Sequence, residues 1–153
     1  MSVRFKKRLI LICAVFVGVS YHLSADVNPE TTSQEPVEAD VHEFMEYAFE
    51  PFFESLKDSL ASEPKDRKAW KAVKANSLIL AENGNLLMLR GPKEHSKKWN
   101  ELSAAMRDQG KHVYKGGKKR DYQSTRKAFV SFVAKCNACH EAFADGEHMQ
   151  SAD

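Results

Sequence analysis

From residue 41 onward, apolar residues recur at spacings of three and four, the period of a helix that buries one face. The first stretch predicts a helix over residues 41–60. Its expected inner stripe is Val41, Met45, Ala48, Phe52, Leu56 and Leu60. Pro51 lies within this helix, and we expect a kink or a local break there because proline lacks an amide donor and crowds the preceding turn.

Two further helices follow the same pattern. The second is expected from about Asp66 to Arg90, where Gly91-Pro92 ends it. Its inner residues are Trp70, Val73, Ser77, Leu80 and Leu87. The third is expected from about His95 to Tyr114, closed by Gly116-Gly117. Its inner residues are Trp99, Leu102, Met106 and Val113.

A fourth helix is expected from a cap at Asp121 to about Phe143. Its inner face carries Tyr122, Thr125, Phe129, Phe132, Val133, Cys136, His140 and Phe143. No stretch alternates as a strand does between turn signals, so the expected class is all-α. Short connections between four amphipathic helices predict an antiparallel four-helix bundle.

The first 25 residues have the composition of a signal peptide. A basic start up to Arg8 precedes an apolar run over residues 9–19, and Leu23-Ser24-Ala25 offers small residues for cleavage. The run is shorter than the roughly 20 residues that span a bilayer. We therefore expect an exported, periplasmic protein. An uncleaved anchor is the alternative, since Ser20–Leu23 can extend the apolar segment.

The remaining chain divides into a leader and a domain. Residues 26–36 are polar, contain two prolines and lack apolar periodicity, which predicts a flexible leader. Residues 37–153 form the expected bundle domain. The whole chain of 153 residues is 42% hydrophobic, enough for one packed core.

The net charge of +2 depends on the signal peptide. Four of the 23 basic residues and none of the 21 acidic ones lie in residues 1–25, so the rest of the chain carries −2. This gives no reason to expect a nucleic-acid partner. One basic cluster stands out at Lys111, His112, Lys115, Lys118, Lys119 and Arg120. It is either a solvated surface or a patch that steers an acidic redox partner.

The candidate chemistry lies at the end of the fourth helix. Cys136 and Cys139, followed by His140, form the pattern C-x-x-C-H of c-type haem attachment. Two thiols three residues apart can form thioethers with the two vinyl groups of one porphyrin. The next residue, a histidine, can then bind the iron from the proximal side.

Three other interpretations of the two cysteines fit less well. A thioredoxin-like pair follows a strand, whereas residues 128–134 continue a helical pattern. A disulfide across so short a loop would restrict the unfolded chain very little. Zinc would need further ligands, and none of His42, His95, His112 and His148 has a standard finger spacing.

The segment Phe132–Phe143, FVAKCNACHEAF, resembles the class II c-type cytochromes, that is, cytochrome c prime and its low-spin relatives. The resemblance implies one covalent haem c inside a left-handed antiparallel bundle near the C-terminal helix, and frequently a homodimer. It places the distal ligand at Met45. It also reveals two departures, Ala144 and Val41, at positions where the family usually has a cation. Arg90, Lys97 and Lys135 are the alternatives for pairing with the haem propionates.

A methionine opposite His140 would suit an electron carrier, because Met/His ligation gives low-spin iron with a raised potential. We therefore expect a non-enzymatic cytochrome that exchanges single electrons with periplasmic or membrane-bound redox proteins. If Met45 only packs in the core, the open iron would instead bind nitric oxide or carbon monoxide. A peroxidase is disfavoured because no distal acid–base pair is evident near Met45. His42 is expected at the pocket edge. Trp70, Trp99 and Tyr122 are expected in the core or packed against the haem, and Met88 and Met106 in the core.

Overall fold

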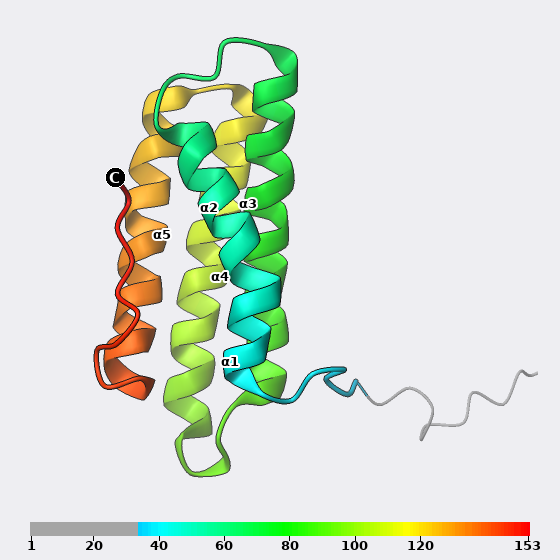
Figure 1. The fold of residues 1–153 in the computed structure, drawn as a ribbon, viewed down its shortest axis with the longest axis vertical. Helices are drawn as coiled ribbons and strands as arrows, with labels where there is room; N and C mark the ends of the chain where they lie inside the picture. Colours follow the sequence, from blue (N-terminus) through cyan, green and yellow to red (C-terminus); the bar gives the residue numbers. More distant parts are fainter. Residues whose placement is uncertain (1–33) are drawn as a thin grey trace, which may run out of the picture. The chain divides into compact units, whose positions relative to one another are not determined.

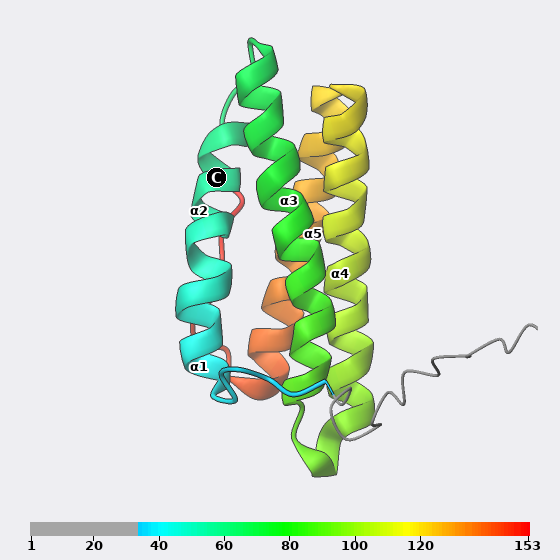
Figure 2. The ribbon, with the colours of Figure 1, turned by 90° about the vertical axis from the view of Figure 1, so that its right-hand side faces the viewer.

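The computed structural model describes residues 34–153. The expected signal peptide at residues 1–25 and most of the expected leader lie outside this range. The described residues form helices joined by turns and contain no strand, so the all-α class is confirmed. Figures 1 and 2 show the long helical segments packed side by side.

The first helical segment consists of α1 (Val41–Phe44), a π-helical turn η2 (Met45–Phe49) and α2 (Glu50–Leu60). The break expected near Pro51 is this π turn, after which Pro51 occupies the first turn of α2, where a missing amide donor costs least. The side chain of Asn83 donates a hydrogen bond to the carbonyl of Ala48 inside the π turn.

The π turn also corrects the predicted inner stripe. The buried residues of the segment are Phe44, Phe49, Phe53, Leu56 and Leu60. Val41, Met45, Ala48 and Phe52 are only half-buried. A π turn holds one residue more than an α turn, so it rotates the following residues around the helix axis. A single uninterrupted period of 3.6 residues therefore cannot describe the first helical segment both before and after the π turn.

The second and fourth predicted helices are confirmed almost to the residue. α3 (Arg67–Leu87) continues into a 3-10 turn η3 (Met88–Arg90), and α5 spans Tyr122–Phe143. The carboxylates of Asp66 and Asp121 cap them by accepting hydrogen bonds from the third residue on, at 2.7 Å and 3.0 Å.

The third predicted helix ends later than expected. After a 3-10 turn η4 (Lys93–His95), α4 spans Ser96–Lys119 and passes through Gly116 and Gly117, both buried. It ends at Arg120, whose φ of 55° is left-handed. The two glycines serve close packing instead, because a Cβ added at Gly116 would lie 2.5 Å from Oγ1 of Thr125.

The core forms where α4 packs between α3 and α5 and where the first helical segment packs on α3. Its most deeply buried large side chains are Phe129, Phe132, Leu56, Leu60, Leu80 and Leu87. The first helical segment makes few contacts with α5. The space left between these two elements holds the candidate site.

Candidate functional site

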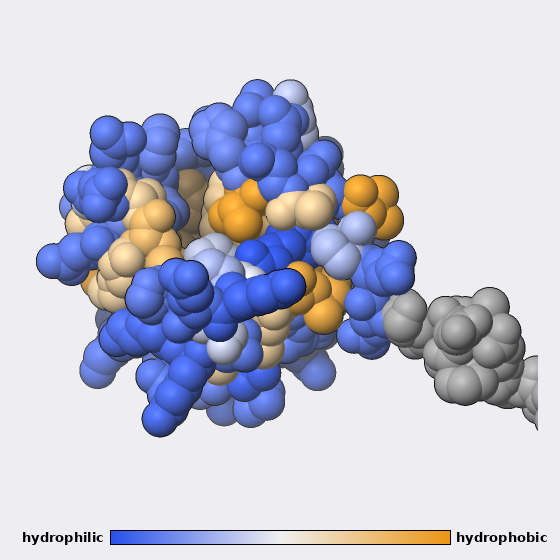
Figure 3. Space-filling model, turned by 90° about the horizontal axis from the view of Figure 1, so that it is seen from below, coloured by the Kyte–Doolittle hydropathy of each residue, from blue (hydrophilic) through white to orange (hydrophobic). Residues whose placement is uncertain are grey.

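A cavity of about 600 Å³ lies between the first helical segment, α4 and α5. This volume falls within the range of roughly 300–1,000 Å³ that is typical of small-molecule and cofactor sites. The walls are mainly apolar, and they include Met45, Phe49, Phe53, Leu102, Met106, Phe132 and Phe143. Seen from below, the molecule shows several apolar patches between hydrophilic side chains (Figure 3).

Aromatic packing closes one end of the cavity. The indole Nε1 of Trp99 donates a hydrogen bond to the carbonyl of Leu87 at 2.6 Å. The ring of Phe143 packs edge-on against Trp99, with their centroids 5.0 Å apart. Leu87, Trp99 and Phe143 all line the cavity. Their contacts tie the ends of α3 and α5 to the start of α4. Trp99 and Trp70 are buried as the sequence predicts.

Both cysteines of the motif line this cavity. Cys136 and Cys139 are only 8% and 7% exposed, and neither forms a disulfide. Three residues apart on α5, they share one face of the helix. Burial raises the pKa of Cys136 to about 12 and also raises the pKa of Cys139. A thioredoxin-like reactive thiol has a lowered pKa, the opposite of the shift that burial produces here.

His140 lies at the edge of the same cavity, and a hydrogen bond defines its tautomer. Its Nδ1 is 2.8 Å from the backbone carbonyl of His148. Because a carbonyl oxygen can only accept, Nδ1 must carry the proton, which leaves Nε2 with a free lone pair. Burial lowers the pKa of His140, an effect that the carbonyl of His148 partly opposes. The neutral imidazole is the form that binds a metal.

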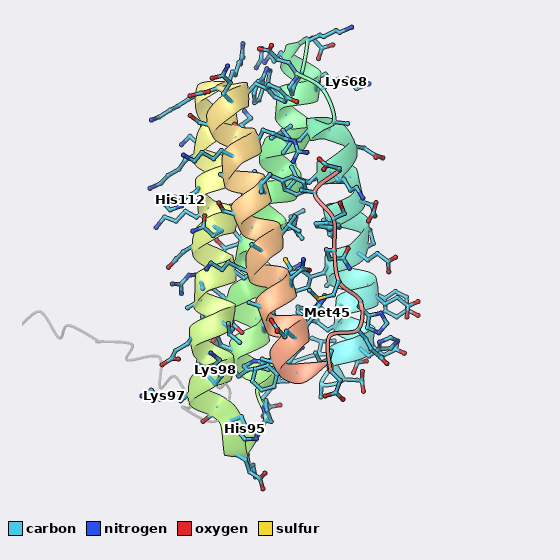
Figure 4. All side chains as sticks on the ribbon, turned by 90° about the vertical axis from the view of Figure 1, so that its left-hand side faces the viewer. Met45, Lys68, His95, Lys97, Lys98 and His112 are labelled. Carbon is cyan, nitrogen blue, oxygen red and sulfur yellow. The ribbon has the colours of Figure 1, made fainter. Side chains whose placement is uncertain are left out.

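Met45 lines the cavity with the three motif residues and is half-buried. Figure 4 shows it on the first helical segment, beside α5 and the C-terminal tail. Its neighbour one turn earlier, His42, is exposed at the cavity edge as expected, with its ring centroid 6.2 Å from that of His148. Met45 therefore lies close to the part of the chain that holds His140.

Met106 lines the cavity as well and is only 3% exposed. The sequence predicts Met106 as a core residue. It is buried in the core and also lines the cavity. It lies seven residues beyond Trp99, about 10 Å along α4, whereas His140 is three residues, about 4.5 Å, from Phe143. Met106 is thus deeper in the cavity than His140. Met88, also expected in the core, is half-buried at η3.

One buried hydroxyl in the cavity wall has no partner. Ser103 is 1% exposed, and its Oγ makes no hydrogen bond within the described structure. A serine in a helix commonly donates to the carbonyl four residues earlier, as Ser77 does to Val73 at 2.6 Å. An orphaned buried hydroxyl costs about 1–3 kcal/mol. Ser103 therefore marks where an occupant of the cavity would find a hydrogen-bond donor.

No lysine or arginine is among the residues that line the cavity. Arg90 instead stacks 3.7 Å above the ring of Phe44 and donates to the carbonyls of Glu38 and Leu86, both at 2.7 Å. Lys97 and Lys135 do not reach the cavity either. None of the three cations considered for propionate pairing lines the cavity, and the acidic residues that line it are Glu46, Glu50, Glu54 and Glu147.

Sequence reasoning missed several residues of this site: Ser103, His148, Gln150 and Glu147. Ser103 lies four residues after Trp99, so the helical period could have placed it on the inner face. The other three follow α5 in an irregular tail, where no periodicity reports which residues turn inward.

Among the described residues, no group of three or more His, Cys, Asp or Glu side chains is arranged to hold a metal ion.

Within residues 34–153, no helix has the length and apolar character needed to cross a membrane. The chain was also compared with protein-family models, with curated proteins and with solved structures, and nothing matched. The resemblance to class II cytochromes therefore stays an expectation from the sequence.

Proposed function

We propose that this chain is an exported monohaem c-type cytochrome that carries single electrons between redox partners. The observation that supports it is the convergence of Cys136, Cys139, His140 and Met45 on one mainly apolar cavity. A C-x-x-C-H motif on a solvent-facing helix would have no room for a porphyrin. Here the cavity lies beside the motif.

The residues that line the cavity are of the kinds and number that would hold a haem: two thiols, one imidazole and one thioether. Cys136 and Cys139 would hold the porphyrin through thioether bonds, and Nε2 of His140 would bind the iron. Met45 would also bind the iron, through a soft thioether that stabilises reduced iron. The bound haem would supply the one-electron chemistry. The protein binds the cofactor, excludes water and sets the potential.

The proposal includes the finer parts of the fold and the setting. The four helical segments would form an antiparallel bundle around the haem, and the protein would work in the periplasm after export. Its partners would be periplasmic or membrane-bound redox proteins, and a homodimer is an expected assembly. It would not be an enzyme, since the haem would exchange electrons only.

The test is the optical spectrum of the mature protein, expressed with the cytochrome c maturation machinery. We expect a covalently bound haem and sharp bands after reduction. A weak near-red sulfur-to-iron band should appear after oxidation, and carbon monoxide should have no effect. Cys136→Ala and Cys139→Ala should weaken or abolish covalent attachment. Unweakened covalent attachment of haem in both variants would contradict the proposal.

The same spectra test the second candidate, a gas-binding protein of the cytochrome c prime kind. It would have broad high-spin bands that sharpen when carbon monoxide is added. That result would assign Met45 to packing and leave the distal face of the iron open. A protein without any haem would eliminate both candidates.

A further inference from the structure

The last ten residues form a strap, Ala144–Asp153, that turns back along α5 (Figure 1). The carbonyl of His140 accepts hydrogen bonds from the amides of Ala144 and Gly146, at 2.8 Å and 3.2 Å. Asp145, Gly146 and His148 all have positive φ, between 49° and 76°, which reverses the direction of the chain. The strap therefore runs back along α5 and passes the motif Cys136–His140, shortly after which it begins.

Asn137, one of the two residues between the cysteines, fastens the strap. Its Oδ1 accepts a hydrogen bond from the amide of Gln150 at 2.7 Å, and its Nδ2 donates to the carbonyl of Gln150 at 2.9 Å. One side-chain amide therefore satisfies both backbone groups of one residue, much as a paired strand would. Further along, Arg126 and Asp153 form an ion pair at 2.6 Å, and Ala152 packs against the core.

The fastened strap places the carbonyl of His148 against His140. That carbonyl accepts from Nδ1 of His140 at 2.8 Å and from Nε2 of the Gln150 side chain, also at 2.8 Å. It is thus oriented by a second donor, independent of the imidazole. A partner on the non-binding nitrogen of a ligating histidine fixes its tautomer and ring orientation and makes it a more basic ligand.

We propose that the strap is the positioning element of the proximal ligand. Asn137 locks Gln150, Gln150 holds the carbonyl of His148, and this carbonyl keeps the proton of His140 on Nδ1 so that Nε2 is free for the iron. The inference rests on the proposed function for the role of the iron, but the strap and the tautomer it imposes can be tested without haem.

Two truncations distinguish the effect of the strap's contacts with Asn137 and His140 from the effect of losing tail residues in general. Ending the chain after Gly146 removes the carbonyl of His148. Ending it after Gln150 removes the ion pair of Asp153 but leaves the contacts of Asn137 and His140 in place. Each places a new terminal carboxylate in the tail, so the second is a matched control. Asn137→Ala tests the same point in a full-length chain, with Asn85→Ala, an amide on α3 outside the cavity, as its control.

The first readout is the tautomer of His140 in the haem-free chain, measured from its imidazole ¹⁵N shifts, with circular dichroism to establish that each variant is folded. We expect the Nδ1–H form in the unaltered chain and in both controls. It should be lost in the Gly146 truncation and in Asn137→Ala. An unchanged tautomer in both of these folded variants would overturn the proposal.

The second readout is the reduction potential of the haem-loaded protein. Loss of the hydrogen bond makes the imidazole less basic, so the potential should rise in the Gly146 truncation and in Asn137→Ala, but not in the controls. Equal potentials in all variants would also overturn the proposal. If the unaltered chain takes up no haem, the proposed function fails, whereas the tautomer measurement still decides the role of the strap.

Discussion

Ser103 and Ser77 are both fully buried serines within long helices, yet only Ser77 has a hydrogen-bond acceptor. Replacement by alanine gives the same gain in helix propensity at both positions. In the haem-free protein we expect Ser103→Ala to be more stable than Ser77→Ala by about 1 kcal/mol, because only Ser77 loses a hydrogen bond. Urea unfolding of the two variants measures the difference.

Loading with haem should change this comparison if the bound group accepts a hydrogen bond from Ser103. The advantage of Ser103→Ala would then shrink or reverse, again by about 1 kcal/mol. If Ser103→Ala already destabilised the haem-free chain, the hydroxyl would have a partner that the structure does not show.

Met45 and Met106 both line the cavity, so the choice between them belongs to the residue scale as well. Leucine has nearly the volume of methionine and cannot ligate iron, which makes Met45→Leu and Met106→Leu a matched pair. We expect Met45→Leu to convert low-spin iron to high-spin iron and Met106→Leu to leave the spectrum unchanged. The reverse outcome would move the distal ligand to Met106.

Helix packing explains why two adjacent glycines occur inside α4. A Cβ at Gly116 would lie 2.5 Å from Oγ1 and 3.1 Å from Cα of Thr125 on α5, too close for the backbones to stay in place. At Gly117 the nearest atoms are Cγ1 of Val73 at 3.2 Å and Cγ of Lys74 at 3.3 Å, in side chains that can adjust.

These contacts predict different effects of the same substitution at neighbouring positions. Gly116→Ala should destabilise the fold by about 1–3 kcal/mol through overpacking. Gly117→Ala should be close to neutral, because the gain of about 1 kcal/mol in helix propensity offsets the small adjustment of α3. Thermal unfolding of both variants tests this, and equal losses would mean that α5 does not approach Gly116 more closely than α3 approaches Gly117.

Charge is distributed unevenly over the molecule. The cavity mouth carries Glu46, Glu50, Glu54 and Glu147. The basic cluster between Lys111 and Arg120 is exposed on the C-terminal part of α4, from about 7 Å to about 20 Å along the helix beyond Met106. Figure 4 shows His112 of this cluster well away from Met45. A partner approaching the mouth of the cavity would therefore meet negative charge first.

This distribution predicts how a haem-loaded protein reacts with small redox reagents. At low salt a cationic reagent should react about tenfold faster than an anionic one of equal driving force, because the mouth concentrates positive ions. The ratio should fall as salt shortens the screening length to about 10 Å at 0.1 M. Stopped-flow measurements with both reagents test it.

Paired charge variants provide the control. Glu46→Gln with Glu50→Gln should reduce the preference for the cationic reagent, whereas Lys115→Gln with Lys118→Gln should leave it nearly unchanged. A preference for the anionic reagent that depends on the lysines would mean that the basic cluster guides electron transfer after all.

The sequence by itself determined the features that arise within one helix. The spacing of apolar residues gave four helical segments, Asp66 and Asp121 were recognisable as caps, and the motif Cys136–His140 identified the candidate chemistry. All of these depend on neighbours within about four residues, where the helical period and the capping geometry act. Two predictions from the sequence were wrong: where α4 ends, and which residues around Met45 in the first helical segment face inward. Both errors come from packing between helices.

Only the tertiary structure decided what faces the cavity. Three features of the site depend on residues of different elements or of an irregular tail. They are the π turn that places Met45 and Phe49, the orphaned hydroxyl of Ser103, and the carbonyl of His148 behind His140. Such contacts form when the first helical segment, α4 and α5 pack around a shared space. No local period encodes them, because their partners are set by how the elements meet and not by the spacing along the chain.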